Sequence, residues 1–231
     1  MPTASQLGKA VLTLTPMVAP LVAGGSLRWL LDAAIEGYAK LPGARKAAAS
    51  QLARSGDHEA AINSLITQHV TMAGAQGFVT NLGGVLTALV TVPANIAAVS
   101  VIQCRIVATI AHLRGYDLDD NRVRSAVLAC LLGERRTKEL VKSGELPSTP
   151  LAIATAPVFD AELDLKVSQH VLRDVLGAVS GKRLGVFVTK KVPVLGGGVA
   201  LAVDGWSTRS VAAYAKTQFP SRRPAGRLTA H

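Results

Sequence analysis

The sequence predicts an all-α protein, a multi-helix bundle around a central apolar helical hairpin rich in Gly and Ala. Apolar residues recur at helical spacing through most of the chain, and no convincing strand hairpin interrupts that pattern. In addition, the 45 residues from Ala60 to Cys104 contain no Asp, Glu, Lys or Arg, although charged segments lie on both sides. A helical stretch of this length without charge is expected to be shielded from water, so it should form the centre of the fold.

Capping and stop signals place the other helices around this centre. Ser26 caps a first helix, which ends at Leu41-Pro42-Gly43. Asp57 caps the helix that leads into the uncharged segment, and Asp119 or Asp120 caps a later one. Further helices are predicted over residues 44–54, 134–142, 161–179 and 204–219, with a proline-rich connection over 143–157. The glycines 196–198 are read as a helix break or as a site of close packing.

Proline favours the first turn of a helix, so Pro93 is predicted to separate the two helices of the hairpin. The first runs from Phe78 to Val92 and the second from Ala94 to Arg114. Small residues along both would let the two backbones approach closely, as in membrane hairpins and in tight soluble bundles. The residues that mark this predicted membrane hairpin are Phe78, Gly83, Gly84, Pro93 and Ile106.

Two environments for the hairpin stay open. It could insert in, or lie against, the cytoplasmic membrane, although each helix is near the lower length limit for a span and Asn95 and Gln103 oppose full insertion. Alternatively, it is the core of a soluble helical bundle that binds a protein partner or a hydrophobic ligand. The outer amphipathic helices support this alternative.

Charge favours the membrane environment. The chain carries a net charge of +10, and residues 182–231 hold nine basic residues against one acidic residue, Asp204. A basic, apolar region of this kind is typical of contact with anionic lipid. Nucleic acid is a less suitable partner, because the aromatic side chains that stack on bases make up only 4% of the chain. Cys104 and Cys130 are predicted to be buried, reduced thiols.

Arg105, at the end of the uncharged segment, is the leading candidate for a functional residue. An unpartnered guanidinium inside a bundle would cost several kcal/mol, so it needs a carboxylate, a helix C-terminus or a lipid phosphate. Asp204 is the candidate partner, and the pair is either a structural ion pair or part of an anionic headgroup site. This candidate buried polar site comprises Arg105, Asp204, Asn95, Gln103 and His112.

Catalytic motifs are missing from the sequence. It contains no GxSxG motif and no phosphate-binding loop of the GxxxxGK[ST] type, and its histidines lie on separate segments. No Cys/His spacing predicts zinc. We therefore assign no catalytic, cofactor-binding or metal-binding residue and expect a protein that is not an enzyme. A cleft joining His112, Asp117 and Arg105 would change that expectation.

Several short motifs resemble those of the EcsC protein family of bacteria, over roughly residues 30–219. They are Leu41-Pro42-Gly43, Leu82-Gly83-Gly84, Val92-Pro93-Ala94-Asn95, and the stretch from Ile102-Gln103-Cys104-Arg105 through Ile110–Leu118. The resemblance implies a helical bacterial protein without an established biochemical activity, and it transfers no catalytic residue. We expect a single domain over 26–219 in the bacterial cytoplasm, associated with the cytoplasmic membrane, with a partly irregular segment at 1–25 and a disordered basic tail at 220–231.

Overall fold

The computed structural model describes residues 27–38, 41–81, 85–180 and 193–223; at residue 38 and over 74–81, 85–97, 175–180 and 193–204 it describes the backbone alone. Almost all regular structure in these residues is helical, which confirms the predicted all-α class. The elements are α2 (Leu27–Glu36), β1 (Gly37–Tyr38), β2 (Leu41–Pro42), α3 (Ala44–Ser55), α4 (His58–Asn81), α5 (Val85–Leu113), α6 (Asn121–Cys130), α7 (Gly133–Lys142), α8 (Pro150–Ala154), α9 (Ala161–Ser180) and α11 (Pro193–Gln218).

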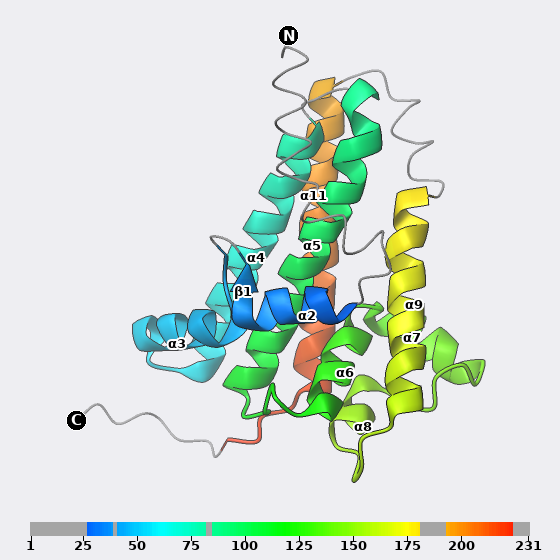
Figure 1. Ribbon diagram of the computed structural model, residues 1–231. Coiled ribbons are helices and arrows are strands. Elements are labelled where there is room, and N and C mark those ends of the chain that lie inside the picture. The colour runs from blue at the N-terminus through cyan, green and yellow to red at the C-terminus, as the bar shows by residue number, and fades with distance from the viewer. Residues whose placement is uncertain (1–26, 39–40, 82–84, 181–192, 224–231) are drawn as a thin grey trace.

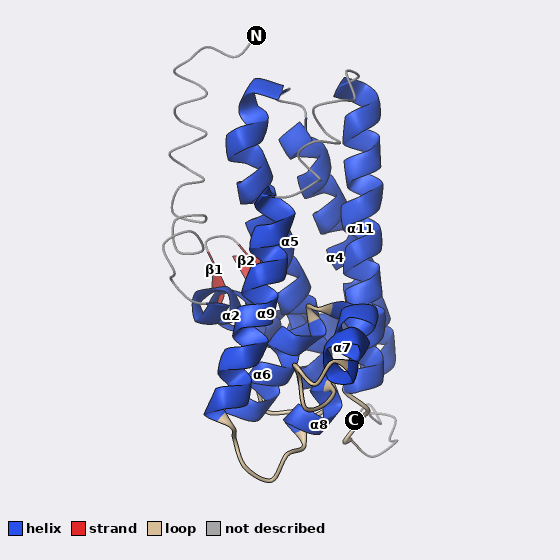
Figure 2. Cartoon of the chain, turned by 90° about the vertical axis from the view of Figure 1, so that its right-hand side faces the viewer, coloured by secondary structure: helices blue, strands red, loops and turns tan. Residues whose placement is uncertain are grey.

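Three long helices, α4, α5 and α11, form the axis of the molecule (Figure 1). They lie side by side, and α11 packs along both of the others. Most of the shorter helices gather around the lower half of this axis and α9 reaches higher, while the upper ends of the three long helices extend beyond all of them (Figures 1 and 2). The upper ends are the C-terminal end of α4 and the N-terminal ends of α5 and α11, so the start of α11 meets a part of the chain far earlier in the sequence.

The turn predicted at Pro93 is wrong. Helix α4 continues to Asn81, and α5 begins at Val85 and passes through Pro93. Residues 82–84, which contain Gly83 and Gly84, lie outside the described part of the chain. An internal proline removes one backbone hydrogen bond, a cost that packing in a long bundle can offset.

Of the two readings of glycines 196–198, the helix break is wrong, because these residues lie inside α11. Packing along two neighbouring helices outweighs their low helix propensity. Other boundaries agree with the sequence. Asp120 caps α6 by accepting a hydrogen bond from the backbone N of Arg122 (2.9 Å), and Asp57 accepts one from the backbone N of Ala60 (2.8 Å).

A small antiparallel pairing of β1 with β2, which the sequence did not predict, follows α2. Its geometry depends on two glycines. Gly37 has a φ of +105°, a conformation that glycine adopts without strain. A Cβ atom at Gly43 would lie 2.2 Å from the backbone oxygen of Ile35, so only glycine lets α3 start against the end of α2. This contact brings Pro42 to the side of α5.

The described part of the uncharged segment is not uniformly shielded, contrary to expectation. On α4, Ile62 and Leu65 are buried, while Asn63, Thr67 and Thr71 are exposed, so uncharged polar groups keep this face in water. On α5, Ile106 is fully buried in the protein's own core and does not face lipid as the predicted membrane hairpin required.

Candidate functional site

Arg105 lies on α5 in the centre of the bundle, with a relative exposure of only 5%. Its Nε donates a hydrogen bond to the carbonyl of Pro42 (2.6 Å), and its Nη1 lies 2.8 Å from Nε2 of His69. On the other side of the His69 ring, Nδ1 lies 2.7 Å from the carbonyl of Leu65. Because a carbonyl only accepts, Nδ1 carries the proton and Nε2 accepts from Arg105. The guanidinium therefore joins β2, α4 and α5.

The electrostatics of this cluster keep His69 neutral. Burial, and secondarily the charge of Arg105, lower the pKa of His69 to about 4. Burial also lowers the pKa of Arg105, yet an arginine stays protonated in proteins. Among the side chains that the structure describes, no carboxylate lies within ion-pair distance of Arg105. The side chain of Asp204 lies outside that set, so the predicted pair between Arg105 and Asp204 stays a prediction.

Gln103 lies on α5 two residues before Arg105 and connects α5 to α11. Its Nε2 donates to Oγ of Ser207 (3.0 Å) and lies 3.4 Å from Oγ1 of Thr208. The amide that opposed membrane insertion in the sequence is thus satisfied within the protein. The side chain of Asn95, predicted to play a similar part, lies outside the described residues, as do those of Phe78 and Pro93.

His112 is not part of this cluster. It is half-buried near the lower end of α5, where its carbonyl accepts from Nη2 of Arg223 (3.4 Å). Burial, together with the charges of Arg45 and Arg223, lowers the pKa of His112 against the opposing effect of Asp117. The structure therefore does not bring His112, Asp117 and Arg105 into one cleft.

Sequence reasoning missed the role of Arg114, which holds the C-terminal end of α11. Its Nη1 donates to the carbonyls of Lys216 (2.6 Å) and Phe219 (2.8 Å), which are free acceptors at a helix end. Its Nε and Nη2 both donate to Oε1 of Glu59 (2.9 and 2.6 Å). Burial alone would raise the pKa of Glu59, but the Arg114 guanidinium and the nearby Lys216 ammonium lower it overall.

Aromatic contacts complete this attachment, which we call the C-terminal latch (Arg114, Tyr116, Phe219 and Arg222). The rings of Tyr116 and Phe219 meet edge to face at 5.0 Å, and the guanidinium of Arg222 lies 3.9 Å from the centre of the Tyr116 ring. Residues 220–223 are exposed, yet the backbone N of Arg222 donates to the carbonyl of Arg114 (2.9 Å), so this start of the predicted tail contacts the domain. The sequence signal was available in the Arg114-Gly115-Tyr116 part of the family motif.

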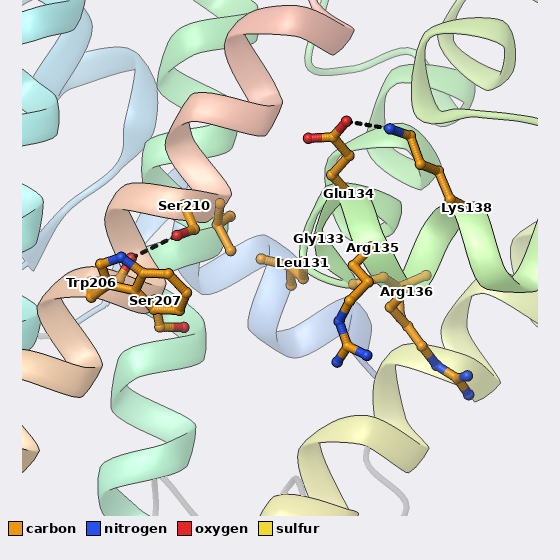
Figure 3. A pocket seen from close by; sticks show the side chains of 11 residues that line it. Leu131, Gly133, Glu134, Arg135, Arg136, Lys138, Trp206, Ser207 and Ser210 are labelled. Atoms are coloured by element: carbon orange, nitrogen blue, oxygen red, sulfur yellow. Dashed lines mark hydrogen bonds and ion pairs between the residues drawn. The ribbon is translucent and has the colours of Figure 1, made fainter.

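A surface groove of about 620 Å³ lies between α7 and α11, and the sequence analysis did not identify it either (Figure 3). Arg135, Arg136 and Lys138 line its α7 side, and Trp206 and Ser210 line its α11 side. Trp206 is 72% exposed, the second most exposed large hydrophobic side chain among the described residues.

Neither the buried cluster nor the cysteines offer a reactive group. Nε2 of His69, the atom a general base would use, already accepts from Arg105. Burial raises the pKa values of Cys104 and Cys130, which disfavours the reactive thiolate. Within residues that the structure describes, no group of three or more His, Cys, Asp or Glu side chains could hold a metal ion. The cluster is thus equipped to hold helices together.

The buried state of His69 predicts how stability depends on pH. The folded protein binds the proton at a pKa of about 4, well below the ordinary value of 6.5, so the unfolded chain takes it up first as the pH falls. Stability should therefore be lost between pH 6.5 and 4, by about 2 kcal/mol from pH 7.5 to pH 5. Urea unfolding at several pH values should show that the free energy of unfolding of His69→Gln lacks this decrease. Groups that titrate in both proteins cancel when the two are compared. If the free energy of unfolding fell equally with pH in both proteins, the assignment would be wrong.

In the described residues, no helix combines the length and apolar character needed to cross a membrane. Comparison with family models matches residues 47–223 to the EcsC protein family, a match that covers Arg105, the C-terminal latch and the groove. Neither curated proteins nor solved structures gave a match to this chain. Because the family match spans more than half of the chain, the protein belongs to the EcsC protein family.

Proposed function

We propose that this protein is a membrane-associated, non-catalytic protein that places the uncharged end of its helical bundle against anionic lipid of the cytoplasmic membrane. One observation carries the proposal. The upper ends of α4, α5 and α11 lie together (Figures 1 and 2), and their sequences over 74–81, 85–97 and 193–203 contain no Asp, Glu, Lys or Arg. The shorter helices of the described chain surround the opposite half.

The dimensions favour contact with one leaflet. The uncharged segments 85–97 of α5 and 193–203 of α11 span 13 and 11 residues, or about 20 and 16 Å at 1.5 Å per residue. The hydrocarbon core of a bilayer is about 30 Å thick. An end of this length is suited to the headgroup region and the upper acyl chains of a single leaflet.

Charge supports anionic lipid as the partner. Residues 181–192, which connect α9 to the uncharged end of α11, contain four basic and no acidic residues. Each Lys or Arg near an anionic surface contributes about 1 kcal/mol to binding. A membrane protein is the alternative partner, because its surface within the membrane is also apolar.

Flotation of the full chain with vesicles tests the proposal. The protein should float with phosphatidylglycerol-containing vesicles, less so in high salt, and poorly with phosphatidylcholine alone. Phe78→Glu places a charge in the uncharged end of α4 and should weaken flotation about tenfold or more. Thr67→Glu adds the same charge to an exposed position of the same helix and is the control. A protein that stays at the bottom of the gradient with every vesicle would end the proposal.

The second candidate is a soluble bundle that binds a protein partner or a hydrophobic ligand. The observation in its favour is that Ile106 and the lower part of α5 are enclosed by the protein itself, while α4 exposes uncharged polar groups to water. Failure to float, combined with a monodisperse protein in buffer without detergent, would select this function.

A further inference from the structure

The groove between α7 and α11 lies where the uncharged part of α11 ends and charged residues begin. Helix α11 is uncharged from Pro193 to Val203, and Asp204 is its first charged residue. Trp206 follows two residues later, about 3 Å further along the helix axis. It therefore stands at the border between the uncharged end and the charged body. Tryptophan is enriched at this level in proteins that contact lipid, because its ring is apolar and its N–H is polar.

Basic side chains face Trp206 across the groove. Helix α7 carries four basic and two acidic residues. In Figure 3, Arg135 and Arg136 extend downward, to the side where the uncharged part of α11 lies, while Glu134 and Lys138 lie on the opposite side. The side chain of Arg135 is 88% exposed. The Arg135 guanidinium thus lies on the opposite wall of the groove from an exposed indole, while Arg136 turns toward α9.

Three carboxylates, Glu134, Glu139 and Asp174, pair with the three basic side chains of the groove, so its formal charges balance. Arg135 pairs with Glu139 at 3.0 Å and Lys138 with Glu134 at 2.6 Å, both across one turn of an exposed helix. Such pairs are weak because water competes for both partners, so a phosphate can replace the carboxylate. Arg136 also contacts Asp174 of α9 at 3.6 Å, which fixes α7 beside the bundle.

We propose that this groove binds the phosphate groups of anionic lipids, with Trp206 seated at the membrane interface. The proposal rests on the membrane association proposed above and adds an orientation to it. In this orientation the long helices are roughly perpendicular to the membrane plane. The uncharged end of the bundle enters the leaflet to the depth of Trp206. Arg135 and Arg136 then lie at the level of the phosphates, and the apolar Leu131 and Val211 line the groove between the two helices.

Fluorescence of Trp206 tests the seating. Trp29→Phe leaves Trp206 as the single tryptophan of the full chain, and circular dichroism checks that the variant is folded. Vesicles containing phosphatidylglycerol should shift its emission to shorter wavelength, and brominated lipids should quench it. Arg135→Gln should weaken binding to these vesicles about fivefold, the share of one arginine at an anionic surface. Arg54→Gln removes the same charge from an exposed position on α3 and should have a smaller effect.

The outcomes separate the two proposals. If the protein floats but the emission of Trp206 is unchanged and the two arginine variants bind equally, the groove assignment is wrong and membrane association stands. If nothing floats, the membrane proposal fails first. A blue shift caused by inorganic phosphate or by poly-glutamate without vesicles would assign the groove to a soluble anion or an acidic protein partner and overturn the lipid assignment.

Discussion

Arg114→Met is expected to destabilise the protein by about 2–4 kcal/mol, because carbonyls at the end of α11 lose a charged donor and each unsatisfied group costs about 1–3 kcal/mol. For a chain of this size the melting temperature should fall by roughly 4–16 °C. The reason is that Arg114 donates to two carbonyls at the end of α11 and to Glu59. Methionine preserves much of the apolar stem, so the loss reports the hydrogen bonds. Thermal unfolding followed by circular dichroism measures it.

Arg135→Met is the matched control for this variant. Arg135 also hydrogen-bonds to a glutamate, at 3.0 Å, but across one turn of an exposed helix. Its replacement should change the free energy of unfolding by no more than about 0.5 kcal/mol. If both variants lost the same free energy of unfolding, Arg114 would stabilise the protein no more than a surface ion pair does. The stabilising role assigned to the C-terminal latch would then be wrong.

Gly43→Ala should be nearly as damaging, although a single methyl group is added. The backbone at Gly43 has a φ of −63°, which alanine adopts freely, so conformational preference alone predicts no penalty. The new Cβ would nevertheless lie 2.2 Å from the oxygen of Ile35 and 2.5 Å from the carbonyl carbon of Glu36. Backbone atoms must move apart, and with them the carbonyl of Pro42 that Arg105 binds. We expect a loss of about 3 kcal/mol in urea unfolding, at the upper end for overpacking.

Gly56→Ala provides the opposite case. Gly56 has a φ of +65° but nothing within 4 Å of the position of an added Cβ. Alanine there should lose about 1–2 kcal/mol, the cost of the left-handed conformation alone. If Gly56→Ala proved the worse variant, close approach at the junction of α2 and α3 would not be the reason for glycine at position 43.

The sequence predicted helix boundaries well where residues close in the chain, such as capping residues, determine them. Asp57 and Asp120 cap their helices as expected, and the ends of α7 and α9 fall within about a residue of their predictions, as capping rules allow. The turn at Pro93 and the break at glycines 196–198 failed because packing among α4, α5 and α11 outweighs the propensity of individual residues.

The candidate site shows the same division between local and distant causes. The sequence indicated that Arg105 must find a buried partner, since a guanidinium in an uncharged segment cannot be left alone. It did not indicate His69 or the carbonyl of Pro42, because these groups lie 36 and 63 residues away and a backbone carbonyl leaves no mark in a sequence. The groove was missed for a related reason: α7 and α11 are distant in the chain, and only the fold brings Trp206 opposite Arg135.

The C-terminal latch has a consequence for how the protein is made. Arg114 binds carbonyls that lie 102 and 105 residues later in the chain. At ribosomal speeds of about 5–20 residues per second, roughly 5–20 s pass between the synthesis of the guanidinium and that of its acceptors. Until the last helix emerges, this arginine has only Glu59 to bind, and the bundle has one of its three axial helices missing. A nascent chain stalled before residue 216 should therefore be an open, protease-sensitive intermediate.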